Sequence, residues 1–179
     1  MSPLPPLPTG PACPTPPERT YSAFSLANHF VAVAEDAGVR TMGFHRLTLL
    51  TYAAHGITLA LHDVPLLSEP VLATVDGPII ASLFLAAHGG VVRGALQELN
   101  PATGGFEDAA PPPPSDIAAC EVLDSVWGRY HLSSDSGLAE ELEFPWRVCR
   151  VKDGFQSGAV LPDAYSNVYF TDLLTRIMA

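Results

Sequence analysis

The stretch "TMGFHRLTLLTYAAHGITLALHD" (41–63) constrains the fold of this chain more than any other part of the sequence. Its apolar side chains recur at the three- and four-residue steps of one helical face, at Phe44, Leu47, Leu50, Ala54, Ile57 and Leu61. Other apolar side chains lie off that face, at Leu49, Tyr52 and Leu59. A helix that is apolar on most sides must be surrounded by other elements. The sequence therefore predicts a mainly α fold, a compact helical domain around a central buried helix that Thr41 caps, with two short β-strands.

The segment "ATVDGPIIASLF" (73–84) places Asp-Gly-Pro between two apolar runs. Apolar residues alternate around its start, which predicts a short strand, at Val71, Ala73 and Val75. Asp76 is a favourable N-cap, and Pro78 fits the first turn of a helix because its missing N–H would have no partner there. Gly77 permits a tight turn between the two elements. The segment is therefore predicted to join a strand to a buried helix.

Capping residues and prolines predict further helices along the chain. Ser22 and Gly38 mark the start and the end of one helix, and Ser115 marks the start of another. A short acidic helix is expected to end before Pro145, because proline removes a helical hydrogen bond. Pro162 stands where the first turn of a last helix is expected.

Proline-rich composition sets the expected boundaries of the domain. Residues 1–19 are predicted to be a disordered tail, because their prolines can neither extend a helix nor donate ladder hydrogen bonds. Residues 20–179 are then expected to form a single helical domain. It contains a Pro/Gly-rich loop at 100–115 and a second short strand at 155–161.

Charge and hydropathy narrow the choice of partner. The formal net charge is −10, and the only cluster of basic residues is Arg147, Arg150 and Lys152, so direct binding to nucleic acid is not expected. The longest uncharged runs, 47–62 and 77–92, are shorter than the roughly 20 apolar residues that span a bilayer, so no membrane partner is expected. The three cysteines are widely spaced without a paired motif, which favours a reducing, cytoplasmic location, at Cys13, Cys120 and Cys149.

Three groups of residues follow a family pattern in both order and spacing. The first lies in "LTLLTYAAHGITLA" (47–60) and comprises Leu47, Leu50, Tyr52, Ala54, Gly56 and Leu59. The second lies in "PLLSEPVLATVDGPI" (65–79) and comprises Pro65, Leu66, Glu69, Ala73, Gly77 and Pro78. The third lies in "VWGRYHLSSDSGLAEELEFPW" (126–146) and comprises Val126, Tyr130, Leu138, Pro145 and Trp146. With these residues the chain resembles the Panacea domain, the SocA-like or phage-associated antitoxin family, over about residues 22–175.

The resemblance implies an antitoxin of a toxin–antitoxin system that neutralises a cognate toxin protein by direct binding, with no catalytic residue and no cofactor. It also allows an adaptor role, in which the toxin is delivered to an energy-dependent AAA+ protease. The motif lysine and two motif tryptophans of the family are replaced by Leu49, Ile57 and Thr74, and the Thr-His pair before the final Pro-Trp is missing. Because the toxins of the family vary widely, the resemblance implies a general platform with a surface tailored to its own toxin.

Six residues are candidates for contact with the partner. Three belong to the family pattern or its turn, namely Tyr52, Asp76 and Trp146. The other three form an acidic run that suits a basic toxin surface, namely Glu140, Glu141 and Glu143. Each has a structural alternative: a core tyrosine with its hydroxyl paired, a helix cap, an indole packed onto the domain, and a solvated acidic face.

Two other functions stay open at the level of the sequence. His55 and His62 lie seven residues apart on one helical face, with Asp63 adjacent, which is the starting point for a small metal-dependent enzyme. No third ligand completes that set, so no metal is expected. The proline-rich tail favours a peptide-binding scaffold as the other alternative.

Overall fold

The computed structural model describes residues 15–87, 90–152 and 158–178, so most of the proposed tail lies outside the described residues. The helices are α1 (Ala23–Asp36), α2 (Phe44–His62), α3 (Ala81–Ala87), α4 (Ile117–Tyr130), α5 (Asp135–Glu141), α6 (Glu143–Lys152) and α7 (Asp163–Met178). The strands are β1 (Met42–Gly43), β2 (Val71–Thr74), β3 (Gly77–Ile80), β4 (Val91–Val92), β5 (Gln97–Leu99), β6 (Phe106–Asp108) and β7 (Ala159–Val160). The fold is therefore mainly α with small antiparallel sheets, and the described residues form more strands than the two expected.

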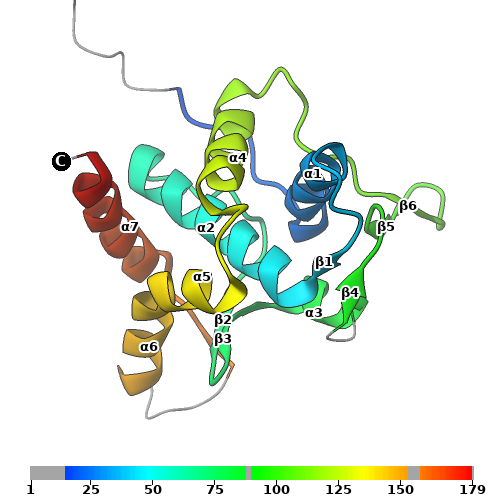
Figure 1. Cartoon of the computed structure of the whole chain (residues 1–179). Helices are drawn as coiled ribbons and strands as arrows, with labels where there is room; N and C mark the ends of the chain where they lie inside the picture. The colour runs from blue at the N-terminus through cyan, green and yellow to red at the C-terminus, as the bar shows by residue number, and fades with distance from the viewer. Residues whose placement is uncertain (1–14, 88–89, 153–157, 179) are drawn as a thin grey trace, which may run out of the picture.

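Helix α2 contacts α1, α4 and α7, and it also touches α3 and α5. Figure 1 shows it running diagonally between α7 on one side and α1 on the other. Every side chain from Leu47 to Leu59 is buried, which covers all faces of the helix. Even the polar stripe of Thr48, Thr51, His55 and Thr58 is buried, so neighbouring elements enclose this segment on every face.

A close helix–helix contact joins α2 to α7 at Gly56. The ring of Phe170, which is fully buried, lies so near that a Cβ added to Gly56 would be 2.0 Å from its Cε2. Tyr52 packs edge-on against the same ring, with 5.6 Å between ring centroids. The motif glycine therefore makes room for an aromatic side chain of α7.

The Asp-Gly-Pro segment is a β-hairpin, so the prediction that Asp76 caps a helix was wrong. Val71–Thr74 pairs with Gly77–Ile80 in antiparallel register, and residues 75–76 form the turn. Gly77 has φ +127°, a conformation that favours glycine. The helix begins only at Ala81, and the expectation that it is buried was wrong, since Phe84 and Leu85 are largely exposed. The predicted strand is confirmed over residues 71–74, with Val75 in the turn, and it pairs on its other edge with β7.

Of the three predicted N-caps, one is confirmed and two are wrong. Ser22 caps α1, since its Oγ accepts a hydrogen bond from the Ser25 N–H at 3.1 Å. The proposed cap Thr41 was wrong, because residues 42–43 pair with β4 and Gly43 holds the cap position without a side-chain bond. Ser115 was also wrong, since Asp116 accepts from the Ala119 N–H at 3.1 Å.

The short acidic helix does end before Pro145, as α5 at Glu141, but Pro145 is not the residue that ends it. A break at Leu142 separates α5 from α6, and Pro145 lies in the first turn of α6. The first N–H groups of a helix have no partner within it, so a proline there removes no helical hydrogen bond.

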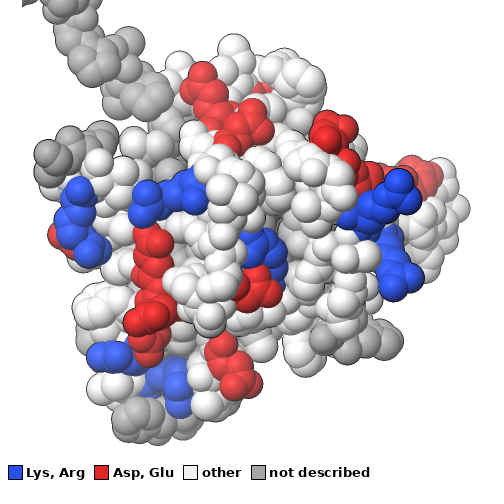
Figure 2. Space-filling view, in the orientation of Figure 1, with Lys and Arg blue, Asp and Glu red and all other residues white. Residues whose placement is uncertain are grey.

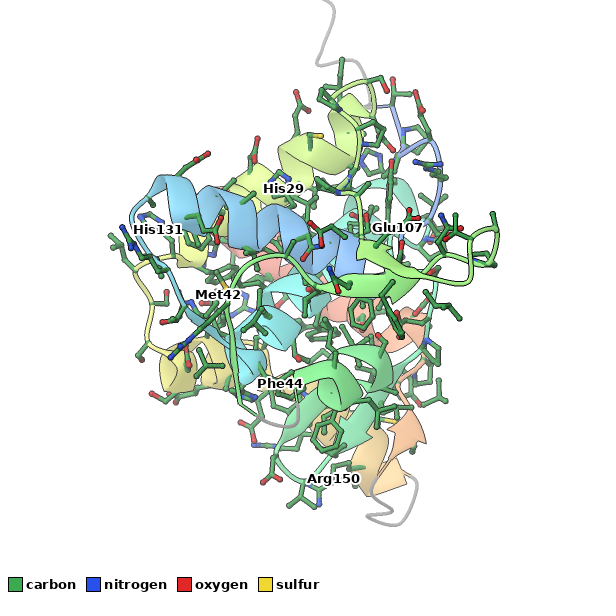
Figure 3. The ribbon with its side chains drawn as sticks, turned by 90° about the vertical axis from the view of Figure 1, so that its right-hand side faces the viewer. His29, Met42, Phe44, Glu107, His131 and Arg150 are labelled. Atoms are coloured by element: carbon green, nitrogen blue, oxygen red, sulfur yellow. The ribbon has the colours of Figure 1, made fainter. Side chains whose placement is uncertain are left out.

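The predicted loop at 100–115 contains strand β6, which pairs with β5 in a hairpin that extends from the body of the molecule with Glu107 on it (Figure 3). Asn28 of α1 holds the base of this hairpin. Its amide nitrogen donates to the carbonyls of Leu96 and Ala109 at 2.8 and 2.7 Å, and its oxygen accepts from the Leu96 N–H at 2.7 Å. One buried side chain thus ties a long connection to the core.

Arg46 of α2 joins the end of α4 to the start of α5. Its guanidinium donates to the carbonyls of Tyr130, His131 and Ser133 and to Asp135 Oδ1, at distances from 2.7 to 2.9 Å. Its side chain is 14 % exposed. The planar fork of arginine suits this arrangement, in which several acceptors surround one cation.

Two buried hydroxyl groups on α2 are expected to lower the free energy of unfolding. Among the described residues, Thr48 Oγ1 and Thr51 Oγ1 have no hydrogen-bond partner. We expect Thr48→Val and Thr51→Val each to raise the free energy of unfolding by about 1 kcal/mol, because an unpaired buried polar group is costly. Urea unfolding would measure this. Thr58 donates to the Ala54 carbonyl at 2.8 Å, so Thr58→Val is the matched control and should give no gain.

Within the described ranges, no helix is both long enough and apolar enough to cross a lipid bilayer.

Candidate protein-binding surface

Two grooves flank helix α7. The first lies between the C-terminal ends of α2 and α7 and the length of α4, and it has a volume of about 340 Å³. Its lining is predominantly aliphatic, with Ile57, Leu61, Val122, Leu173, Leu174 and Ile177. The second lies between α7 and the α5–α6 pair and has a volume of about 980 Å³. Leu173 and Ile177 line both grooves, so α7 is their common wall.

Exposed apolar side chains gather along these grooves. Val168 and Phe144 of the second groove are 72 % and 56 % exposed, and Leu61 of the first is 40 % exposed. Ile177 on the common wall is 45 % exposed. We call the two grooves with these four side chains the α7 surface. A group of large apolar side chains left in water is typical of a site that another molecule covers.

The sequence of α7 explains why apolar residues are left outside. Phe170 and Leu173 face the core and are buried, at 0 % and 5 % exposure. At about 100° per residue, Val168 is turned by about 160° from Phe170 and faces away from the core. Ile177 lies on the same side as Phe170 but two turns further along, at the end of the helix, where it lines both grooves. The helix thus has more apolar residues than its core-facing side can bury.

Ion pairs surround the second groove. Arg129 lies 2.7 Å from Glu141, Arg176 lies 3.0 Å from Asp172, and Arg147 lies 3.5 Å from Glu143. Figure 2 shows the alternation of acidic and basic residues over the region of α5, α6 and α7. Glu121 lines the first groove and Glu140 the second, and in the part of the chain that the structure describes neither carboxylate forms an ion pair.

Glu141, which lines the second groove, connects α4, α5 and α7 by hydrogen bonds. Its carboxylate accepts from Arg129 and from the buried Tyr130 hydroxyl at 3.3 Å, and its carbonyl accepts from the Tyr169 hydroxyl of α7. Burial is the main cause that raises the pKa of Tyr130 to about 12. The tyrosine therefore remains a neutral donor at physiological pH. This network holds α5 against α4 and α7.

The structure brings one of the two sets of predicted partner residues to the α7 surface. The acidic run Glu140, Glu141 and Glu143 lines the second groove. Asp76 is exposed at the turn of the β2–β3 hairpin and lines neither groove.

The other two predicted partner residues lie inside the domain. Tyr52 is fully buried, and its hydroxyl is 3.2 Å from Ser166 Oγ of α7. Trp146 is 6 % exposed, and its indole lies close to Gly77 of the β2–β3 hairpin. In this structure both side chains pack inside the domain. This agrees with the structural alternatives given above, a core tyrosine with its hydroxyl paired and an indole packed onto the domain.

The histidines proposed as metal ligands lie in different surroundings. His55 is buried and its Nδ1 accepts from the Leu67 N–H at 3.3 Å, so its Nε2 carries the hydrogen that Asp163 Oδ1 accepts at 3.1 Å. His62 lies at the first groove. Among the described residues, no three His, Cys, Asp or Glu side chains are placed to hold a metal ion.

The His55–Asp163 bond should make stability depend on pH. The hydrogen bond from His55 is the main cause that lowers the pKa of Asp163 below its ordinary value of 3.8. Its ionised form therefore stabilises the fold above about pH 3.8, and this contribution is lost as the pH falls through the lowered pKa. We expect wild type to exceed Asp163→Asn in unfolding free energy at pH 5, with the difference shrinking toward pH 2.5.

Urea unfolding at both pH values measures the difference. Asp172→Asn, an exposed carboxylate on the same helix, is the control and should show little change. A gap between wild type and Asp163→Asn that stays constant with pH would contradict the assignment.

Sequence reasoning did not find Leu61, Phe144, Val168 and Ile177 as surface residues. An available signal was the pair of apolar residues four positions apart at Leu173 and Ile177. Which of the two faces water depends on how α7 packs, so the sequence pattern alone does not distinguish them.

No family model matches the chain, and no match was found among curated proteins or solved structures.

Proposed function

We propose that this protein is the antitoxin of a toxin–antitoxin system, and that it neutralises a cognate toxin protein by binding it across the α7 surface. The observation that carries the proposal is the group of exposed apolar side chains at the two grooves. The Panacea-like residue pattern supports it from the sequence. In this proposal α2 is the central buried helix of a domain that spans residues 20–179 and acts in the cytoplasm.

Neutralisation by binding needs no bond-breaking chemistry. A stable protein interface buries about 1,600 Å² in total, and a few well-packed side chains provide most of the affinity. Leu61, Phe144, Val168 and Ile177 are the side chains we assign to that role. Their common feature is that the fold leaves them outside while it positions them on rigid helices.

Buried residues of the family pattern position the helices that form the α7 surface. Gly56 and Tyr52 contact Phe170 and so seat α7 on α2. Tyr130 fixes Glu141 at the edge of the second groove. The shared pattern thus accounts for the platform, and the residues outside it account for the choice of toxin.

The test is rescue of growth. The protein is expressed with the product of its neighbouring gene, and we expect wild type to restore growth and to co-purify with that product. Ile177→Glu places a charge at the centre of the surface and should lose both effects. Phe106→Glu is the matched control, because Phe106 is 71 % exposed on the β5–β6 hairpin, away from α7 (Figure 1). Circular dichroism verifies that both variants fold.

Occlusion and delivery are two forms of the same proposal. If the antitoxin only covers the toxin, the half-life of the toxin in the cell stays constant or rises. If the antitoxin delivers the toxin to an AAA+ protease, the half-life falls only when both antitoxin and protease are present. Deleting residues 1–14, which lie outside the described residues, tests whether the tail takes part.

A further inference from the structure

We infer that the first groove of the α7 surface binds an amphipathic α-helix of the toxin, with an aliphatic stripe and with lysine or arginine along its flanks. This inference rests on the proposed function, since it names the part of the toxin that is bound. Three features of the groove support it: what forms its walls, what lines it, and which charges stand unpaired around it.

The walls of the groove favour a helix over an extended strand. They are formed by residues of α2, α4 and α7, such as Ile57, Val122 and Leu173. Within a helix the backbone N–H and C=O groups are paired with each other, so these walls offer no ladder to which a strand could add. An occupant must therefore satisfy its own backbone hydrogen bonds, and a helix does so.

The lining of the groove requires aliphatic side chains. Leu61 and Ile177 are half-exposed on its sides, and most of its lining residues are apolar. A volume of about 340 Å³ accommodates a few side chains of leucine size. On a helix these side chains lie at steps of three and four residues, which gives the expected stripe.

The charges around the α7 surface favour basic flanks. The arginines of its rim, Arg129, Arg147 and Arg176, each lie beside a carboxylate of the same rim. The carboxylates of Glu121 at the first groove and Glu140 at the second form no ion pair among the described residues. A net charge of −10 adds a long-range attraction for basic segments. A partner with acidic flanks would be repelled.

Binding of a labelled peptide to the full-length protein tests the inference. The probe is a peptide of about four helical turns, with leucines at three- and four-residue steps, lysines on both sides of this stripe, and alanines elsewhere. Two matched peptides carry glutamates in place of the lysines, or the same residues with the stripe scrambled. Fluorescence anisotropy gives the Kd at low and high salt.

We expect the lysine peptide to bind about tenfold more tightly than either matched peptide, and less tightly at high salt. Ile177→Glu should weaken it about tenfold, whereas Phe106→Glu should leave the Kd unchanged. The double variant Glu121→Lys, Glu140→Lys should reverse the preference toward the glutamate peptide. Equal binding of the lysine and glutamate peptides, or equal Kd values for Ile177→Glu and Phe106→Glu, would overturn the inference.

Other occupants give different results, and each would also overturn it. If the first groove binds a second copy, the wild type sediments as a dimer and Ile177→Glu as a monomer. If it binds the chain's own N-terminal segment, the lysine peptide binds only after residues 1–14 are deleted.

The proposed function can fail separately. A protein that rescues growth and depends on Ile177, but shows no preference for basic peptides, keeps the function and loses this inference. A protein that binds the lysine peptide but never rescues growth keeps the helix-binding groove and loses the antitoxin function.

Discussion

Gly56→Ala should lower the free energy of unfolding by about 3 kcal/mol, even though alanine is the better helix former. The added methyl group would lie 2.0 Å from the buried ring of Phe170, and neither α2 nor α7 can move away without opening the core. Urea unfolding measures the loss. The double variant Gly56→Ala, Phe170→Leu should recover part of it, because the smaller side chain vacates the contact.

Gly128 provides the control for this substitution. It is also a helical glycine, it is exposed on α4, and a Cβ added there meets nothing within 4 Å. Gly128→Ala should therefore raise stability by up to about 1 kcal/mol. If both variants change stability in the same direction, the close approach of Phe170 is not what requires glycine at position 56.

Arg46→Ala is the second substitution with a large expected effect, a loss of about 3 kcal/mol. The change removes the guanidinium from three backbone carbonyls at the junction of α4 and α5. Arg46→Lys should recover little, because one ammonium group cannot reach acceptors spread across both sides of the fork. Chemical denaturation gives the size of the effect, and amide hydrogen exchange should show faster opening at the end of α4.

Arg147→Ala is the matched control for Arg46. Arg147 is 66 % exposed, and among the described residues its one ion pair is with Glu143, four residues before it on the same helix. Exposed pairs of this kind contribute little, so the change should stay within about 0.5 kcal/mol. A similar loss for both arginines would mean that charge, and not the bonded carbonyls, explains the result.

Local patterns predicted the parts of the fold that depend on neighbours in sequence. The period of apolar residues predicted the helix at 44–62, and Ser22 predicted the start of α1. Alternation of apolar residues predicted the strand at 71–74. In each case the hydrogen bonds or the buried face lie within a few residues of the pattern that predicted the element. Tertiary contacts therefore did not change the local structure.

Errors occurred where distant segments decide the structure. Asp-Gly-Pro is a good helix start and also a good turn, and here β2 pairs with both β3 and the distant β7. Thr41 is not the N-cap of α2, because residues 42–43 pair with residues 91–92. The same reason limits prediction of the site: the acidic run stands out in composition, but the grooves exist only when α4, α5 and α6 meet α7.

Helix α7 also sets when the protein can act during its synthesis. It forms the common wall of both grooves and supplies Phe170 to the core, yet it comprises residues 163–178 and is translated after α1 to α6. While α7 is still inside the ribosome tunnel, the nascent chain has neither a closed core nor a complete α7 surface. On the antitoxin proposal, capture of the toxin begins only after translation of this helix, and a toxin made at the same time has a short interval without its proposed inhibitor.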